Sequence, residues 1–316
     1  MNIFAASLKD KKIVVTGGAG FIGSHIVDAL VKAGATVTVI DNLSTGKKDN
    51  LVWVKDAVTF IEGDITDVDM LKKAFAEAYA VIHHAAVASV PQSIAFPKET
   101  YAVNVTGTQN VFQAARDAGV DRVIYATSSA VYGDDPAMPK VETMKTAPIS
   151  PYGEHKLANE IDAKKMFDAS GLKTIGLRYF NVFGSRQNPF SEYSAVIPKF
   201  ISLMKKGSAP SIYGDGMQTR DFIYVTDIVQ ANMKALEAKA GFGEVYNVAT
   251  GGKISLNDLV AKLNVILGST FVPNYLPAKQ GDIKDSYADI TKARTVLNFE
   301  PQVTFEEGLK KTVENL

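Results

Sequence analysis

The stretch Gly17-Gly18-Ala19-Gly20-Phe21-Ile22-Gly23 decides the fold of the first part of the chain. It follows a short β-branched run, Lys12–Thr16, and precedes a helical run over residues 24–33 that Gly34 closes. Such a run is typical of a buried parallel strand. The three spaced glycines allow a tight turn and close approach to a pyrophosphate, and the helix N-terminus offers unpaired N–H groups to phosphates. The stretch therefore predicts a dinucleotide-binding βαβ unit.

The residue at the end of the next strand bears on the choice of dinucleotide. A second run over residues 36–40 ends in Asp41. A carboxylate there accepts hydrogen bonds from an adenosine ribose and repels a 2′-phosphate, and no arginine lies nearby in the sequence. We therefore expect NAD rather than NADP. A simple turn residue is the alternative interpretation of Asp41.

More apolar runs and helices alternate along the first half of the chain. The runs cover residues 58–62, 80–86, 122–126 and 173–177, and a strong helical pattern covers residues 101–118. Strands that alternate with helices favour a parallel sheet with helices on both faces. We predict an α/β fold, a doubly wound parallel Rossmann-type sheet with a smaller C-terminal α/β substrate lobe.

Composition excludes several classes of function. The chain has 316 residues, 34 basic and 34 acidic side chains, and no cysteine. Balanced charge gives no reason to expect a nucleic-acid or membrane-surface partner, and the lack of cysteine removes disulfides and thiolate metal sites. Residues 1–8 lack the features of a secretory signal, and no apolar run is long enough to cross a bilayer. The expected location is the cytoplasm.

Two adjacent histidines, His83 and His84, raise the question of a metal site. Neighbouring residues of a strand face opposite sides of the sheet, so these two side chains cannot share one ion. The other histidines are His25 and His155, and no carboxylate pair completes a ligand set. No metal is predicted. The small residues Ala85 and Ala86 that come next are better suited to letting the backbone close on a dinucleotide.

A second motif, Ser150-Pro151-Tyr152-Gly153-Glu154-His155-Lys156, carries a phenol and an ammonium four residues apart. Ser150 suits a helix cap and Pro151 the first helical turn, so Tyr152 and Lys156 should lie one turn apart on one helix face. A lysine beside a tyrosine favours the phenolate, which could take a proton from an alcohol that is losing a hydride. The pair alone is a weak signal, because most such pairs are solvated helix surface.

Taken together, the G-x-x-G-x-x-G spacing and the Tyr152–Lys156 pair resemble the extended branch of the short-chain dehydrogenase/reductase family. The resemblance implies that Ser128, Tyr152 and Lys156 are the catalytic residues, and that Asn104 supports the lysine and its water. It implies a first domain over residues 1–178 that binds NAD and carries the catalytic residues. The implied cofactor contacts are Gly17, Gly20, Phe21, Ile22, Gly23, Asp41, Asn42, Asp64, Ile65, Ala85, Ala86, Asn104, Tyr152 and Lys156.

The residues after Ser128 separate the chemistries of this family. Members that dehydrate nucleotide sugars carry an Asp-Glu pair there, and members that decarboxylate carry a glutamate. This chain has Ser129 and Ala130, and neither can act as that acid. The resemblance therefore favours oxidation followed by re-reduction with nothing lost, which is epimerisation.

The second half resembles the UDP-hexose 4-epimerases of the same family, through the segments at residues 178–184, 214–225 and 277–282. Residues 179–316 would form mainly the nucleotide-sugar-binding lobe, with the chain crossing back to the large domain. Lys279 stands where the family usually has arginine, and meets a phosphate only as a point charge. Ser286 replaces a bulky tyrosine and should leave room for an N-acetyl group. The implied substrate contacts are Ser89, Ser128, Asn181, Arg186, Arg220, Lys279, Asp282 and Ser286.

We therefore predict an NAD-dependent enzyme that interconverts UDP-glucose with UDP-galactose, and UDP-GlcNAc with UDP-GalNAc, through a 4-keto sugar. Its partner is then the UDP-sugar. The alternatives are an epimerase of another nucleotide sugar such as UDP-glucuronate, a nucleotide-sugar reductase, or a non-catalytic NAD-binding regulator. The family resemblance also implies a homodimer through residues 101–118 and 152–170, although apolar faces there could equally serve the core.

Overall fold

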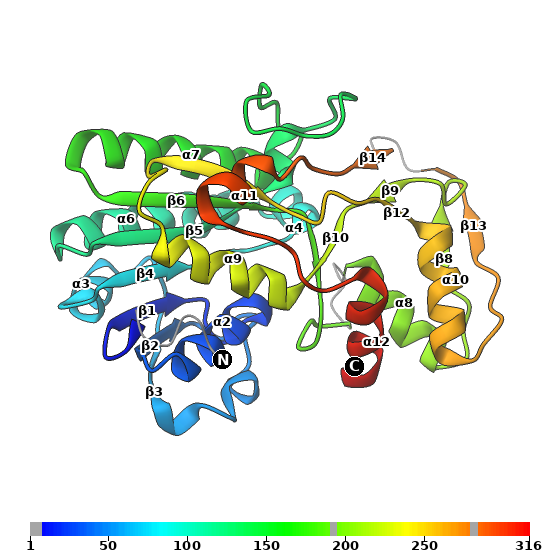
Figure 1. Cartoon of the computed structure of the whole chain (residues 1–316), viewed down its shortest axis with the longest axis horizontal. Coiled ribbons are helices and arrows are strands. Elements are labelled where there is room, and N and C mark those ends of the chain that lie inside the picture. The colour runs from blue at the N-terminus through cyan, green and yellow to red at the C-terminus, as the bar shows by residue number, and fades with distance from the viewer. Residues whose placement is uncertain (1–7, 190–194, 279–283) are drawn as a thin grey trace.

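The computed structural model describes residues 8–189, 195–278 and 284–316 (Figure 1). Its centre is a seven-stranded sheet in the order β3-β2-β1-β4-β5-β6-β11, and every neighbouring pair is parallel. The predicted doubly wound sheet is confirmed. The strands are β1 (Lys12–Thr16), β2 (Thr36–Asp41), β3 (Val58–Glu62), β4 (Ala80–His83), β5 (Arg122–Ser128), β6 (Lys173–Tyr179) and β11 (Glu244–Val248).

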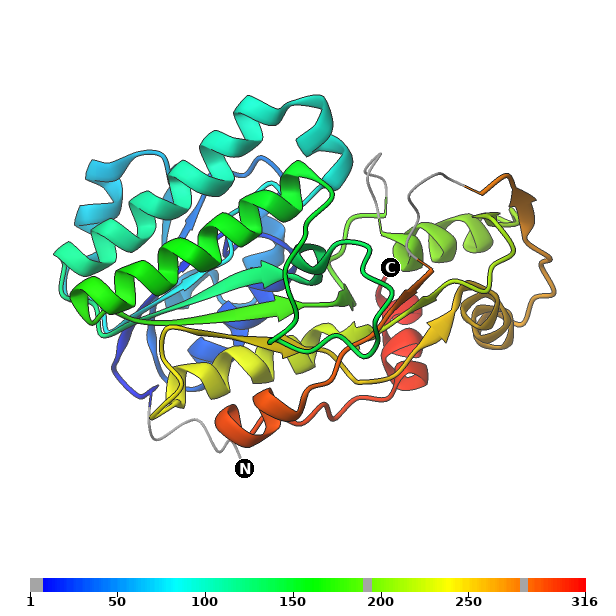
Figure 2. The same ribbon diagram turned by 90° about the horizontal axis from the view of Figure 1, so that it is seen from above.

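Helices cover both faces of this sheet in two layers (Figure 2). One layer contains α3 (Val68–Phe75), α6 (Thr108–Asp117) and α7 (Pro151–Ser170), which pack on one another in that order. The other contains α2 (Phe21–Lys32), α9 (Val225–Glu237) and α11 (Thr291–Leu297). Each layer encloses its own apolar core, because strands buried on both faces are hydrophobic throughout.

The helix predicted over residues 101–118 is continuous in space but not uniform. It consists of α5 (Pro97–Tyr101), a π-helical segment η3 (Ala102–Gly107) and then α6. π-helical turns inside α-helices frequently mark functional sites. In this one, Asn104 is fully buried and Gly107 approaches the side chain of Ile65.

The described part of the smaller lobe, drawn on the right in Figure 1, is built from short strands and three helices around a third apolar core. Its strand pairs are β7 with β10, β8 with β13, and β9 with both β12 and β14. The helices are α8 (Val196–Lys205), α10 (Leu256–Leu267) and α12 (Phe305–Asn315). The strands are β7 (Asn181–Phe183), β8 (Ser211–Tyr213), β9 (Thr219–Arg220), β10 (Phe222–Tyr224), β12 (Ile254–Ser255), β13 (Asn274–Leu276) and β14 (Asp285–Ser286).

The chain passes between the two parts several times. It leaves the large sheet after β6 for β7, returns from β10 to α9, leaves again from β11 to β12, returns from β14 to α11, and finally leaves for α12. Thus α9, β11 and α11 belong spatially to the large sheet although they come after residue 179. The remaining short elements are η1 (Lys48–Leu51), η2 (Lys55–Ala57), α4 (Val90–Ala95) and η4 (Ser129–Tyr132).

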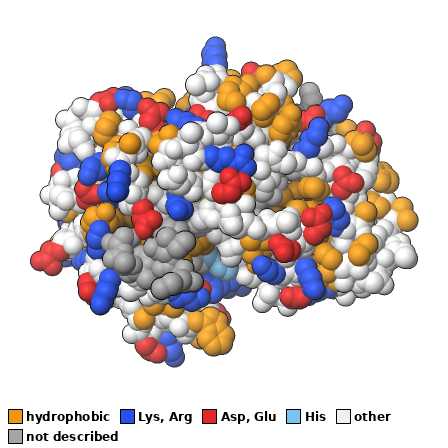
Figure 3. Space-filling model, viewed as in Figure 1, with side chains coloured by type: hydrophobic (Ala, Val, Ile, Leu, Met, Phe, Trp, Pro, Cys, Tyr) orange, Lys and Arg blue, Asp and Glu red, His pale blue; other side chains and the backbone are white. Residues whose placement is uncertain are grey.

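The surface agrees with the balanced composition. On the face drawn in Figure 3, basic and acidic side chains are interspersed rather than gathered by sign. Within the described ranges, no helix has both the length and the apolar character needed to span a bilayer.

Two glycines of the turn after β1 are required by close backbone contacts. Gly17 has φ of +69°, and a Cβ on it would lie 2.6 Å from the backbone nitrogen of Ala85. A Cβ on Gly23 would lie 2.1 Å from the carbonyl oxygen of Gly17. Side chains at these positions would therefore push the turn, the first helix and the exit of β4 apart.

Gly17→Ala should lower the free energy of unfolding by clearly more than Gly119→Ala. Both glycines have φ of +69°, but the Cβ position of Gly119 has no atom within 4 Å. Gly119→Ala should cost roughly 1–2 kcal/mol for the left-handed backbone alone. Gly17→Ala should cost about 1–3 kcal/mol more because of overpacking. Urea unfolding of the cofactor-free proteins measures both, and equal losses would show that the contact with Ala85 is unimportant.

Candidate active site

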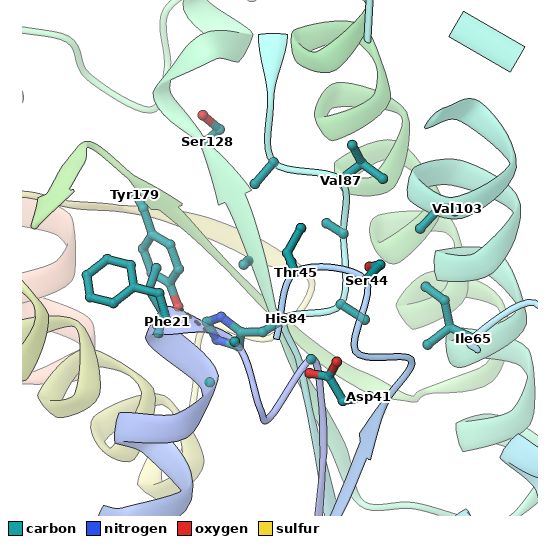
Figure 4. A pocket seen from close by; sticks show the side chains of 18 of the residues that line it. Phe21, Asp41, Ser44, Thr45, Ile65, His84, Val87, Val103, Ser128 and Tyr179 are labelled. Carbon is teal, nitrogen blue, oxygen red and sulfur yellow. Dashed lines mark hydrogen bonds between the residues drawn. The ribbon is translucent and has the colours of Figure 1, made fainter. Parts of the chain in front are cut away.

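A cleft of about 510 Å³ opens at the carboxyl ends of the central strands, where open parallel sheets bind ligands (Figure 4). The first half of the chain supplies nearly all of its lining. Among the predicted contacts, the cleft brings together Gly17, Gly20, Phe21, Ile22, Gly23, Asp41, Asn42, Asp64, Ile65, Ala85, Ala86, Ser128, Tyr152 and Lys156.

The glycine-rich end of the cleft fits a dinucleotide. The cap of α2 is Gly20, which offers no side-chain oxygen to the first helical turn, so those N–H groups are left for another acceptor. The Cβ atoms that Gly17 and Gly23 lack would fill the turn beside it. The residues present therefore fit the pyrophosphate of NAD.

Asp41 holds the turn as well as lining the cleft. Its carboxylate accepts hydrogen bonds from the backbone N–H of Ala19 at 2.9 Å and of Leu43 at 2.8 Å. The side chain is buried, so these two bonds fix the position of the carboxylate before any ligand arrives. The two interpretations of Asp41, turn residue and ribose acceptor, are thus compatible with one geometry.

The next two cleft residues are also linked. Asn42 donates to Asp64 at 2.7 Å, and Asp64 accepts from the backbone and the hydroxyl of Thr66. Partial burial raises the pKa of Asp64, but the hydrogen bonds from Thr66 and Asn42 outweigh it and leave the pKa below its ordinary value. Asp64 therefore presents a carboxylate at neutral pH.

Tyr152 and Lys156 enter the cleft from the first turns of α7. The predicted cap is confirmed, since the Ser150 hydroxyl accepts from the N–H of Gly153 at 3.2 Å. The N–H of Tyr152 donates to the hydroxyl of Ser93, a buried residue of α4, at 3.1 Å. The start of α7 is therefore fixed by its own cap and by helix α4, which comes 59 residues earlier in the chain.

The lysine lies one turn below the phenol. Its ammonium donates to the carbonyl of Ala126 at 2.8 Å and lies 5.9 Å from the centre of the Tyr152 ring. Burial lowers the pKa of Lys156 to about 8, against the opposing effect of Glu160. The ammonium is thus predominantly charged at neutral pH and loses its proton under mildly alkaline conditions.

Burial also has the largest effect on the pKa of the Tyr152 phenol. It raises the pKa of Tyr152, and a hydrogen bond with Ser128 partly lowers it again. Ser128 ends β5 and caps η4, accepting from the N–H of Ala130 at 3.2 Å. In the protein alone, Ser128 is therefore the neighbour that favours the phenolate.

Sequence reasoning missed a polar cluster on the opposite wall of the cleft. His84 is stacked on Tyr179, with ring centres 5.7 Å apart, and its Nε2 lies 3.2 Å from the Tyr179 hydroxyl (Figure 4). The same nitrogen lies 3.3 Å from Oδ1 of Asn232 on α9, whose amide donates to the Tyr179 hydroxyl at 2.7 Å. The position of His84 just after a strand was the available signal, whereas nothing in the sequence marked Asn232.

The neighbouring histidine is structural. His83 lies between the hydroxyls of Thr16 at 2.7 Å and Thr108 at 3.0 Å, and burial lowers its pKa to about 3. Among the described residues, no group of three or more histidine, aspartate or glutamate side chains could hold a metal ion.

A second cavity adjoins the first, and Val182 lines both. It contains Asn181 and Arg220, two of the predicted substrate contacts. The Asn181 amide donates to the carbonyl of Asp221 at 3.3 Å, and the Arg220 guanidinium donates to that of Thr219 at 2.8 Å. Both side chains are partly exposed to the cavity.

Four other predicted contacts in the described part of the chain, Ser89, Asn104, Arg186 and Ser286, do not line either cavity. Ser89 caps α4, Asn104 bonds both backbone groups of Val87 at 2.7 and 3.0 Å, and Ser286 lies on β14 beside Arg220. Arg186 pairs at 2.6 Å with Asp28 of α2. Lys279 and Asp282 lie outside the described residues.

The model of the NAD dependent epimerase/dehydratase family matches residues 13–249. A UDP-glucose 4-epimerase of Mycolicibacterium smegmatis is 38% identical, over 96% of this chain and 97% of that protein.

Two solved structures are similar over nearly their whole length. One is a UDP-N-acetylglucosamine 4-epimerase from Methanobrevibacter ruminantium in complex with UDP-N-acetylmuramic acid, with 44% identity, a TM-score of 0.93, and coverage of 97% of this chain and 98% of that one. The other is a UDP-glucose 4-epimerase from Thermotoga maritima with UDP-glucose, with 40% identity, a TM-score of 0.92, and coverage of 96% and 98%.

His84→Gln should flatten the loss of stability on acidification. Burial lowers the pKa of His84 to about 4 from its ordinary 6.5, so the folded state holds the neutral ring. The stability that this contributes is complete above pH 6.5 and is lost as pH falls toward 4, by up to about 1.4 kcal/mol per pH unit. Urea unfolding at several pH values between 7 and 4 measures the slope. An unchanged slope in the variant would contradict the assignment of a neutral His84 ring in the folded state.

Proposed function

The chain belongs to the NAD dependent epimerase/dehydratase family, and we propose that it is a UDP-hexose 4-epimerase. Its proposed substrates are UDP-glucose and UDP-galactose, and UDP-GlcNAc and UDP-GalNAc. The observation that carries the proposal is the cleft in which Ser128, Tyr152 and Lys156 converge beside a glycine turn suited to NAD. A protein that only bound NAD would need no such set.

NAD, when bound, accepts a hydride from the sugar carbon and gives it back. In our proposal the turn at Gly17–Gly23 holds its pyrophosphate, Asp41 its adenosine ribose, and Asp64 and Ile65 its adenine. Lys156 would hold the nicotinamide ribose. The charge of the oxidised nicotinamide would add to Ser128 and Lys156 in favouring the phenolate of Tyr152.

The chain's own residues would handle the proton and the sugar oxygen. Tyr152, as the phenolate, takes the proton of the sugar's C4 hydroxyl, and Ser128 donates a hydrogen bond to the C4 oxygen. The resulting 4-keto sugar turns over while its diphosphate stays anchored. Tyr152 then returns the proton to the C4 oxygen when the hydride comes back to the other face. The positive charge of Lys156 favours the phenolate form of Tyr152 throughout the reaction.

The two residues after Ser128 favour epimerisation over elimination. Dehydration needs an acid to protonate a leaving hydroxyl, and Ser129 and Ala130 provide none. With no group to leave, the hydride and the proton return to the same carbon and oxygen.

The adjoining cavity is the proposed site of the UDP moiety. Asn181 and Arg220 line it, and a guanidinium suits a diphosphate. Arg220 lines this cavity and Arg186 does not, so we assign the main phosphate contact to Arg220. Lys279 and Asp282 are further proposed contacts from the sequence alone. Ser286, beside Arg220 on the neighbouring strand, is the basis for proposing that N-acetylated hexoses are accepted.

The test is the purified protein incubated with each UDP-hexose and no added cofactor. We expect UDP-glucose and UDP-GlcNAc to be converted to equilibrium mixtures with their C4 epimers, measured by chromatography, because an epimerase consumes no net NAD. Net conversion of added NAD to NADH, or of NADH to NAD, in proportion to the sugar product would indicate a dehydrogenase or a reductase. Conversion of UDP-glucuronate alone would indicate another epimerase, and no conversion at all would favour a binding protein.

Tyr152→Phe is the control for the assigned base. The variant should lose turnover by a factor of at least about 10² while retaining bound NAD, because only the phenol oxygen is removed. NAD content is measured after denaturation of the purified variant. Wild-type rates in this variant would refute the role of Tyr152.

We also propose a homodimer through α5, α6 and α7. Tyr101 is 51% exposed and Ile161 is 48% exposed on α5 and α7. Sedimentation should give twice the 34.0 kDa chain mass, and Ile161→Glu should give the monomer. Val265→Glu, at an 83% exposed position on α10, should leave the dimer intact. A monomeric wild type would contradict the proposal. The cytoplasmic location stays a prediction from the sequence.

A further inference from the structure

The helix that carries Tyr152 and Lys156 presents a third polar residue on the same face. Glu160 lies four residues after Lys156, as Lys156 lies four after Tyr152, so the three side chains form one column along α7. The column faces the end of β5, where Ser128 already bonds Tyr152. Glu160 is buried, and the proton transfer described above makes no use of it.

Lys156 and Glu160 contact consecutive residues of β5. The ammonium of Lys156 donates to the carbonyl of Ala126 at 2.8 Å. The hydroxyl of the next residue, Thr127, donates to Oε1 of Glu160 at 2.7 Å. Three successive residues at the end of β5 therefore each contact one member of the column, which fixes the register of the helix on the strand.

Glu160 is in turn anchored by a bidentate ion pair. Arg178 of β6 donates to its two oxygens at 2.9 and 2.6 Å, and the two side chains are only 4% and 7% exposed. The same guanidinium donates to the hydroxyl of Tyr132 at 2.9 Å, which donates to Asn247 of β11 at 2.7 Å. A buried charge pair is weak evidence for stability, because desolvation opposes its attraction, so stability alone does not explain this pair beside the site.

The charge of Glu160 acts on Lys156. Burial lowers the pKa of Lys156 and Glu160 raises it. The histidines that face the ammonium from the end of β4 are His83 and His84, and burial lowers the pKa of both, which keeps them neutral.

Other titratable groups lie on the elements that pack on α7. They are Lys98, Glu99 and Tyr101 of α5, Arg116 and Asp117 of α6, Arg122 and Tyr125 of β5, Tyr132 of η4, and Lys173, Arg178 and Tyr179 of β6. Those of α7 itself are Tyr152, Glu154, His155, Asp162, Lys164, Lys165 and Asp168.

We propose that Glu160 is a positioning residue of the active site. Docked on Thr127 and Arg178, it holds the column of α7 in register with β5 and supplies the negative charge that keeps the Lys156 ammonium protonated. Its relevance to catalysis rests on the proposed function, since Lys156 must be cationic to favour the phenolate of Tyr152. The charge effect itself does not depend on which sugar reacts.

The test is the titration of Lys156 in the NAD-saturated protein. Lysine labelled with ¹³C at Cε reports the protonation state by NMR, and the Lys156 signal is assigned by its absence in Lys156→Met. In Glu160→Gln the midpoint of this titration should fall by about one pH unit. The alkaline limb of the kcat profile should fall with it. A midpoint equal to that of the wild type would overturn the proposal.

Asp168→Asn is the matched control. Asp168 also lies on α7 and pairs with a lysine, Lys164, at 2.5 Å, but both side chains face solvent. Its loss should leave the Lys156 midpoint unchanged, and an equal fall there would overturn the assignment to Glu160. If Glu160→Gln fails to fold because Arg178 is left unpaired, the double variant with Arg178→Met removes both charges. It should again titrate below the wild type, and a wild-type midpoint would overturn the proposal.

The two hypotheses can fail separately. A lowered midpoint in Glu160→Gln, with no UDP-hexose converted by the wild type, would support the role of Glu160 and reject the proposed function. Conversion by the wild type with an unchanged midpoint would do the reverse.

Discussion

The contact between the turn after β1 and the exit of β4 is the constraint on which the cleft depends. The strand order reverses between these two neighbouring strands, so the loops after them diverge and leave a crevice. Gly17 lies against the backbone of His84 and Ala85, with no room for a Cβ, and closes the floor of that crevice. Asp41 then ties the next strand to the same turn through Ala19. The floor of the crevice is thus fixed by close backbone packing and by one buried carboxylate, and distant segments line the walls above it.

Without a bound ligand, burial holds the pKa values of two site residues away from those that the proposed reaction needs. Burial raises the pKa of Tyr152 and lowers that of Lys156, so each change disfavours the charged form that the proposed reaction needs. Ser128 and Glu160 act against these two effects, one on each residue. Each offsets only part of the burial effect, so the pKa of Tyr152 stays above its ordinary value and that of Lys156 stays below its own. In the proposed mechanism, the positive charge of the oxidised nicotinamide would lower the pKa of Tyr152 further and so favour the phenolate.

The sequence predicted the large sheet well and the walls of the site only in part. Strands β1 and β3 begin and end at the predicted residues, and β5 and β6 run two residues further. Strand β11 was not predicted, since Glu244–Val248 contains glutamate, tyrosine and asparagine. The cluster of His84, Tyr179 and Asn232 comes from three separate segments, and no local pattern could join them. Likewise, Arg186 turns to Asp28 because that carboxylate reaches it from a helix far earlier in the chain.

The repeated passage of the chain between its two parts limits how the molecule can move. Connections after β6, β10, β11, β14 and α11 all join the large sheet to the smaller lobe. A hinge needs a few residues that absorb a rotation, and all of these covalent linkers would have to rotate together. The lobes should therefore not swing apart during turnover. A 4-keto sugar would then have to rotate within a cleft of nearly constant shape. The space around the sugar ring, rather than any opening of the protein, would determine which hexoses can react.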